Sequence, residues 1–291
     1  MKDEILENYL QAGAIASRIL ALGTREVRVG SRILDVVGKI EDMVQDEGAD
    51  LAFPLNLSVN EDAAHDTAVA GDTREFHAGD VVKLDLGVHC GGYIADTATS
   101  VDLGEHAALI SASEKALEAA IGLAKPGIGA GVLGAAIERE IVGRGFRPVA
   151  NLTGHGLDRY KIHTAPTIPN LAGAGGAILE EGMVVAIEPF ASTGTGFVNE
   201  RSRVEIYQQM TQKPVRLPAA RRVLDAVRTR RGLPFARRWL TEEKLDIILP
   251  SLVRTGILHP YPVLHDVTGS FVSQHEHTII ITGDGCIVTT R

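Results

Sequence analysis

The sequence has little cysteine, no long apolar run and no excess of positive charge. Its two cysteines, Cys90 and Cys286, form neither a CxxC motif nor a zinc-finger spacing, which excludes a disulfide framework and favours a reducing compartment. No run of about 18 or more apolar residues occurs, so we expect no membrane span. The formal net charge of −8 argues against a general nucleic-acid binder, and we expect no DNA contact.

What is present has the composition of an ordinary globular protein. Apolar residues make up 45% and charged residues 23% of the 291 residues, enough for one large domain or two modest ones. The chain begins with an acidic segment of helical periodicity. A signal peptide would have a basic start and an unbroken apolar stretch, so we expect a cytoplasmic protein.

Residues 83–102, KLDLGVHCGGYIADTATSVD, place an aspartate in each of two apolar, strand-like segments around a glycine pair. The pattern predicts a hairpin in which Asp85 and Asp96 lie opposite each other. Two carboxylates about 4 Å apart repel by roughly 4 kcal/mol at an effective dielectric constant of 20. The pair therefore requires a cation or a shared proton, unless one aspartate turns outward or caps a turn.

The rest of the chain alternates helical and strand patterns. Helices are predicted at 3–21, 30–47, 111–124 and 129–143. Further strands are predicted at 51–60, 183–188, 196–207 and 277–289. The segment 151–177, rich in glycine, proline and histidine, is expected to be irregular.

Two short segments resemble each other within the chain. GDVVKLD (79–85) is echoed by GMVVAIE (182–188), with an acid at the seventh position of each. Unless the match is chance, it predicts two similar half-domains that share a core, with Asp85 and Glu188 in related places.

A change in composition begins near residue 211. Residues 211–240 carry nine lysines and arginines against one acid, Asp225, and a second helical pattern follows. We predict an insertion subdomain at 208–257 within a main domain formed by 1–207 and 258–291. The basic segment is interpreted either as a solvated helix face or as a contact for the ribosome or RNA.

Three further side chains occupy places where an isolated polar group is hard to explain. Glu188 closes an apolar strand, Glu276 lies between two histidines just before another, and His155 is flanked by glycines. Taken singly, Glu188 could pair with an arginine and His155 could be a satisfied loop histidine. Together with Asp85 and Asp96, they form a hard ligand set suited to two divalent ions of Mn, Fe(II), Co or Zn. Such a pair polarises a carbonyl or phosphoryl group, so the sequence indicates metal-assisted hydrolysis.

These ligands, in this order and context, resemble the methionine aminopeptidases of the pita-bread fold. The similarity extends over nearly the whole chain, through FPLNLSVNEDAAHDTA, DLGVHCGGYIADTATSV, LTGHGLDRYKIH, IEPFASTGTGF and YPVLHDVTGSFVSQHEHTI. The insertion with LPFARRWL is similar to the type 2 subgroup, and the short N-terminus to its archaeal-style form. The resemblance implies an α+β fold of the creatinase/aminopeptidase type. That fold has a pseudo-twofold repeat, antiparallel sheets covered by helices, and here a helical, winged-helix-like insertion.

The resemblance also implies roles for the site residues. The two metal ions would be held by Asp85, Asp96, His155, Glu188 and Glu276. Glu188 would in addition carry a proton to the departing amine. His163 would stabilise the tetrahedral intermediate, and His65 would contact the scissile amide. The methionine side chain would lie in an apolar pocket formed by Phe53, Ile162 and Tyr261, closed by Pro234 and Phe235.

The implied activity is removal of the N-terminal methionine from nascent polypeptides, with a small second residue preferred, by a monomer. The nearest alternative is an Xaa-Pro aminopeptidase or prolidase of the same fold. Those enzymes usually carry an N-terminal domain, for which no room exists here before Phe53. The other alternative is a non-catalytic relative that binds the ribosome or RNA. That reading predicts an eroded ligand set, whereas all five ligands are present.

Overall fold

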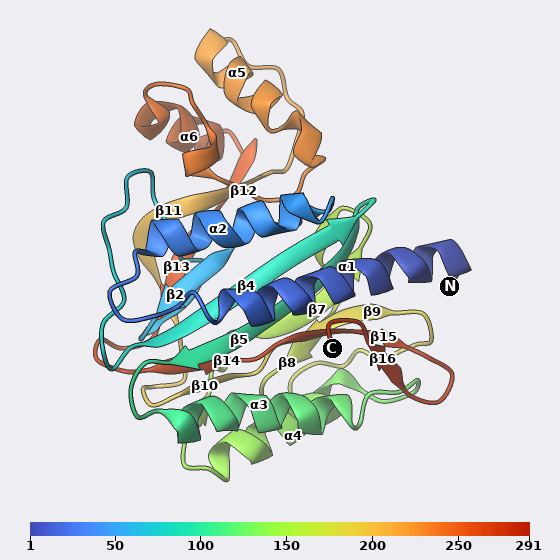
Figure 1. Ribbon diagram of the computed structural model, residues 1–291. Helices are drawn as coiled ribbons and strands as arrows, with labels where there is room; N and C mark the ends of the chain where they lie inside the picture. The colour runs from blue at the N-terminus through green and yellow to red at the C-terminus, as the bar shows by residue number, and fades with distance from the viewer.

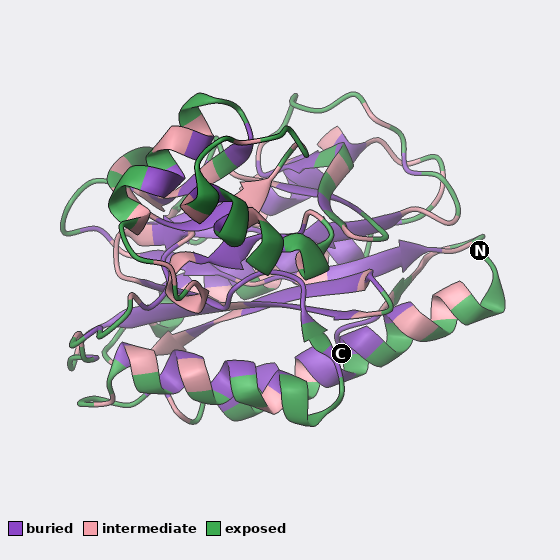
Figure 2. Ribbon diagram, turned by 90° about the horizontal axis from the view of Figure 1, so that it is seen from above, coloured by how far each residue is buried: buried purple, intermediate pink, exposed green.

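The computed structural model describes residues 1–291 and has a strand-rich centre with helices on its outer faces. In Figure 1, α3 and α4 lie along one edge of the molecule, α1 and α2 run across the strands, and α5 and α6 stand apart at the opposite end. Figure 2 shows that the central strands are buried, while the helices turn buried faces inward and exposed faces outward. None of the helices is long and apolar enough to cross a membrane.

The first half of the chain packs two helices on a four-stranded antiparallel sheet. The helices are α1 (Asp3–Gly23) and α2 (Ile33–Asp46). The strands are β1 (Asp50–Leu51), β2 (Asn56–Val59), β4 (Val81–Cys90) and β5 (Tyr93–Asp102). The apolar stripes of both helices form one buried cluster with the inward side chains of β2 and β4. Both predicted helices and the predicted hairpin are thereby confirmed.

The second half repeats this plan on a five-stranded sheet. Its helices, α3 (Ala107–Ile121) and α4 (Ala130–Val142), are also confirmed, although α3 begins four residues before its predicted start. The sheet contains, in order, β16 (Cys286–Val288), β15 (His277–Ile281), β9 (Val184–Ile187), β7 (Thr153–Asp158) and β8 (Lys161–Pro169). A second buried cluster joins these helices to β9 and β15.

The expectation of an irregular segment at 151–177 is wrong for 153–169, where β7 and β8 lie, and is confirmed for 170–177. The glycines of β7 reflect close backbone contacts instead of a loop. A Cβ at Gly154 would lie 2.3 Å from the carbonyl oxygen of Ala186, and one at Gly156 would lie 2.2 Å from that of Ala165. Glycine in a strand marks such close approaches, and the strand register shifts on both sides of Gly156.

A pseudo-twofold axis relates the two halves, as the internal sequence echo predicts. The equivalent glycines Gly79 and Gly182 both adopt left-handed φ values, +95° and +86°, just before β4 and β9. Between the two sheets, Ala98 of β5 and Glu276, directly before β15, exchange two backbone hydrogen bonds of 3.3 and 2.9 Å. Each half therefore contributes one strand to the centre of the molecule.

A third sheet carries the insertion. Its long strands are β11 (Asn199–Gln209) and β13 (Leu258–His265), flanked by β12 (Phe235–Ala236) and β3 (Asp62–Ala64). Helices α5 (Pro218–Ala226) and α6 (Leu245–Arg254) form a buried cluster with this sheet, joined by the 3-10 turns η1 (Arg228–Arg230) and η2 (Arg237–Trp239). A small separate sheet contains β6 (Arg147–Pro148), β10 (Phe190–Ser192) and β14 (Val272–Gln274). The division of the chain into 1–207 with 258–291 and 208–257 stays a prediction.

The insertion docks on α2 through a buried polar contact. The guanidinium of Arg238 pairs with a carboxylate oxygen of Glu41, and both side chains are less than a tenth exposed. The indole N–H of Trp239 donates to the other oxygen of Glu41 at 3.1 Å. Six of the nine basic side chains at 211–240 donate to oxygen acceptors within this chain. Most basic side chains of this segment therefore form hydrogen bonds or ion pairs within the chain.

Candidate active site

The β4–β5 hairpin brings its two aspartates to one face of the sheet. The turn at 91–92 is made of two glycines with φ values of +59° and +93°, which suit the tight reversal. Its register places Asp85 opposite Ala98 and Asp96 opposite Gly87, so the expectation that the carboxylates lie directly opposite each other is wrong. The difference arises because the turn is centred between the two glycines. Asp85 and Asp96 are diagonal neighbours, which long side chains still bridge.

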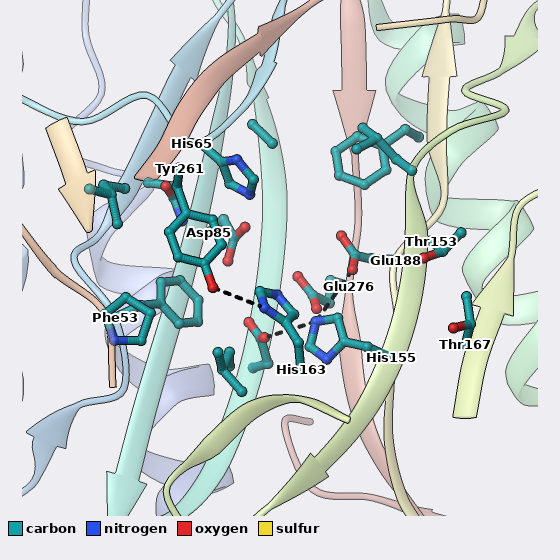
Figure 3. Close-up of a pocket in the computed structure, with 18 of the residues that line it drawn as sticks. Phe53, His65, Asp85, Thr153, His155, His163, Thr167, Glu188, Tyr261 and Glu276 are labelled. Atoms are coloured by element: carbon teal, nitrogen blue, oxygen red, sulfur yellow. Dashed lines mark hydrogen bonds and ion pairs between the residues drawn. The ribbon is translucent and has the colours of Figure 1, made fainter. Parts of the chain in front are cut away.

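A cavity of about 510 Å³ opens beside this hairpin. It is lined by the ten residues predicted as metal ligands, catalytic histidines and pocket walls: Phe53, His65, Asp85, Asp96, His155, Ile162, His163, Glu188, Tyr261 and Glu276. In Figure 3, His155, Glu188 and Glu276 converge on one side of the cavity, and Phe53 lies on the opposite side. The structure thus brings together side chains from both halves and from the insertion sheet.

His155 lies among the carboxylates. Its Nε2 atom is 3.7 Å from Asp96 and 3.5 Å from Glu188, while its Nδ1 atom is 3.3 Å from the carbonyl oxygen of Gly156. Burial, with a smaller contribution from His163, lowers the pKa of His155 to about 3. A neutral imidazole that donates from Nδ1 to a carbonyl leaves its Nε2 lone pair directed at the carboxylates, as a metal ligand requires.

The four acids sit in an environment that opposes their charge. Burial raises the pKa of Asp85 to about 7. Burial, and then repulsion between neighbouring carboxylates, raises the pKa of Asp96, Glu188 and Glu276 well above the ordinary range. Buried carboxylates at this density need a compensating cation or protons.

The hydrogen-bond pattern leaves room for a cation. One buried oxygen of Asp85 and one of Asp96 have no hydrogen-bond partner. Ligand atoms of Asp96, His155 and Glu276 lie within 4.8 Å of one another. Oxygen-rich donors with unpaired buried atoms fit divalent ions such as Mn, Fe(II), Co or Zn. The residues present therefore suit the metal site that the sequence predicts.

Gln274 is a site residue that the sequence analysis missed. Its amide nitrogen lies 3.4 Å from Asp85 and 3.4 Å from Glu276, so it donates toward one acid of each half. The side chain is 1% exposed. The only signal in the sequence is its place two residues before Glu276, on the same face of the chain.

Two histidines line the cavity next to the acids. His163 packs edge-on against His155, with ring centroids 4.5 Å apart, and its Nδ1 atom is 3.4 Å from the hydroxyl of Tyr261. His65 packs against Tyr261 and makes a 3.2 Å contact with the carbonyl of Pro262. Burial lowers the pKa of both histidines to about 4. His65 also adopts a left-handed φ of +63°, a strained conformation of the kind that concentrates at functional sites.

An apolar recess adjoins the polar end. Phe53 and Ile162 line it and belong to one buried cluster with Leu233 of the insertion. Pro234 also lines the cavity, whereas Phe235 is buried in the core of the insertion, where its ring stacks on Tyr207 at 6.1 Å. The expectation that Phe235 closes the pocket is therefore wrong, because neighbouring residues of a strand face opposite sides.

A family model for metallopeptidase family M24 matches residues 7–282. The chain belongs to metallopeptidase family M24. A relative named methionine aminopeptidase, from Archaeoglobus fulgidus, is 46% identical over 292 residues that cover 100% of both chains. Membership of family M24 implies a divalent metal cofactor, in agreement with the donor set of the cavity.

Several solved structures share the fold. A structure titled as a thermophilic Arx1 superposes with a TM-score of 0.90 over 99% of this chain and 91% of that one, at 19% identity. A prolidase from Pyrococcus furiosus superposes with a TM-score of 0.65 and is 20% identical. This chain covers 64% of the prolidase. These likenesses show the pita-bread fold alone.

Proposed function

We propose that this M24 chain removes N-terminal methionine from polypeptides by metal-assisted hydrolysis of the first peptide bond. One observation carries the proposal: a single cavity joins the carboxylate–imidazole set to an apolar recess. A methionine side chain is unbranched, apolar and flexible, which suits such a recess. The full-length relative named methionine aminopeptidase supports the same activity.

The metal site would hold two divalent ions through Asp85, Asp96, His155, Glu188 and Glu276. When bound, such a pair supplies Lewis-acid polarisation of the carbonyl and a nucleophile at neutral pH. The hard donor set suits Mn, Fe(II), Co or Zn. Gln274 would hold Asp85 and Glu276 in place by donating to both.

The remaining residues would bind and orient the substrate and transfer protons. Glu188, 3.5 Å from His155, would accept a proton at the metal end and pass it to the departing amine. His65 and His163, both on the cavity wall, would donate to or accept from the amide that is cleaved. Phe53 and Ile162 would bury the methionine side chain, and so hold the first peptide bond against the carboxylates.

A prolidase-type activity is the alternative within the same fold. Peptides separate the two: the purified chain, supplied with Mn or Co, should release free methionine from Met-Ala-Ser and leave Ala-Pro substrates intact. The reverse preference would overturn the proposal. Replacing Ala by a bulky second residue in the same peptide tests the preference for a small second residue.

We also propose that this chain acts as a cytoplasmic monomer that meets nascent chains near the ribosome. Both cysteines are free, as expected of a reducing compartment. A transient ribosome contact would fall on exposed basic residues without an oxygen partner in the chain, namely Lys213, Arg216 and Arg231. Charge reversal of these three should reduce co-sedimentation with ribosomes without changing peptide cleavage. Unchanged sedimentation would leave them as a solvated surface, and size-exclusion chromatography tests the monomer.

A further inference from the structure

The segment Arg230–Pro234 of the insertion forms one wall of the apolar recess. It is a tight turn: the N–H of Leu233 donates to the carbonyl of Arg230 at 2.9 Å, and Arg231 and Gly232 have φ values of +53° and +90°. Leu233 is buried with Phe53, and Pro234 lines the cavity. The position of this turn therefore sets the width of the recess.

Arg230 connects this wall to the opposite one. Its Nη2 atom donates to the carbonyl of Ala52 at 3.1 Å and to that of Pro234 at 2.8 Å, and its Nε atom donates to Pro234 at 3.2 Å. Ala52 directly precedes Phe53. The guanidinium lies 5.2 Å from the ring centre of Trp239. No carboxylate lies within 4.0 Å of the guanidinium in this structure. Its hydrogen bonds therefore hold the two backbone segments in place and do not neutralise a charge.

Gln208 holds the same turn from the side of the histidines. Its amide nitrogen donates to the carbonyl of Gly232 at 2.8 Å, and its amide oxygen accepts from the hydroxyl of Tyr261 at 2.6 Å. The same hydroxyl is 3.4 Å from Nδ1 of His163. A continuous chain of polar contacts thus runs from the wall of the recess to a histidine of the cavity.

We propose that Arg230 and Gln208 are positioning residues that fix the width of the first-residue pocket, and that Gln208 couples this width to the placement of His163. The inference rests on the proposed aminopeptidase function. Neither side chain lines the cavity, so both act through the residues that do. A loosened wall would bind methionine more weakly and reject bulkier first residues less well.

Three variants test the proposal. Arg230→Met removes all donors and keeps an unbranched side chain. Gln208→Glu is nearly isosteric: it removes the donor to Gly232 and places a carboxylate beside the hydroxyl of Tyr261, which in turn contacts His163. Arg228→Met is the matched control, since Arg228 is exposed and pairs with Asp225 outside the cavity. For each, kcat and KM are measured on Met-Ala-Ser and on Phe-Ala-Ser, and folding is checked by thermal denaturation.

The expected result is a split between KM and kcat. In Arg230→Met, KM for Met-Ala-Ser should rise about tenfold with little change in kcat, and the preference for Met over Phe should fall by about tenfold. Gln208→Glu should show the same loss of preference together with a lower kcat, because His163 is affected as well. Arg228→Met should match the parent chain.

Two results would overturn the proposal. The first is a folded Arg230→Met or Gln208→Glu chain whose Met-over-Phe preference stays within about twofold of the parent. The second is a loss of preference in Arg228→Met as large as in the other two. Failure of the proposed function is a different result, because the parent chain would then release no methionine. If Arg230→Met does not fold, the Met-over-Phe preference of the Gln208→Glu chain tests the proposal.

Discussion

Replacing Asp96 by asparagine should make the metal-free protein more stable and abolish its stabilisation by metal. Asparagine keeps the shape of the side chain and removes one charge from a site that crowds four carboxylates. Ligand atoms of Asp96 and Glu276 lie within 4.8 Å of each other. At that separation two ionised carboxylates repel by about 3.5 kcal/mol at an effective dielectric constant of 20. Protonation of either acid relieves this repulsion and reduces the gain in stability.

The parent chain should therefore be stabilised by metal much more than the variant. With chelator present, Asp96→Asn should melt at a higher temperature than the parent chain, by up to about 14 °C at about 2–4 °C per kcal/mol. At about 100 times its dissociation constant, metal stabilises the parent by about 2.7 kcal/mol, a rise of about 5–10 °C. The variant, lacking one ligand, should gain much less and release no methionine.

Thermal denaturation with chelator and with Mn, on both chains, measures these shifts. Glu105→Gln is the matched control, because Glu105 is an exposed acid shortly after β5, away from the cavity. It should behave as the parent in both conditions. The reasoning is refuted if metal-free Asp96→Asn melts well below the metal-free parent, or if Mn raises both melting temperatures equally.

Three further predictions concern the supports of the site and the fold. Gln274→Ala should weaken metal affinity about 10- to 100-fold, because Asp85 and Glu276 lose the amide donor that they share. Calorimetric titration measures the affinity, and an unchanged value would contradict this. Glu41→Ala should destabilise the protein by about 3–5 kcal/mol in urea unfolding, since it leaves a buried guanidinium unpaired; a loss below about 1 kcal/mol would contradict it. Burial opposes ionisation of Asp266, but hydrogen bonds from hydroxyl and backbone N–H donors outweigh it and lower its pKa. Asp266→Asn should therefore lower the free energy of unfolding above about pH 4, and this loss should vanish as the pH falls through the folded-state pKa of Asp266. An equal loss at neutral pH and at the acid end of the series would refute this.

The sequence predicts the elements whose signals are local. Helical periodicity identifies α1 to α4, and two apolar segments around a glycine pair identify the β4–β5 hairpin. The echo of residues 79–85 in 182–188 predicts the pseudo-twofold arrangement. The cavity residues are predicted through the resemblance of several motifs, since no single motif identifies them.

What the sequence does not predict depends on contacts between distant segments. The glycines at 154 and 156 are typical of a loop by composition, yet they lie in strands because neighbouring backbones approach them closely. Gln274 is an ordinary strand residue until folding places Asp85 across from it. Arg230 belongs to a basic segment that suggests an external partner, and only the fold shows that it bonds to Ala52, 178 residues away.

We propose above all that the carboxylate–imidazole cavity of this M24 chain is a two-metal aminopeptidase site. The most direct test is to titrate the metal-free chain with Mn while measuring bound metal and methionine released from Met-Ala-Ser in the same samples. We predict no release without metal, an increase with bound metal, and a plateau by two equivalents per chain. Full release from the chelated chain, or two bound ions without any release, would contradict the account.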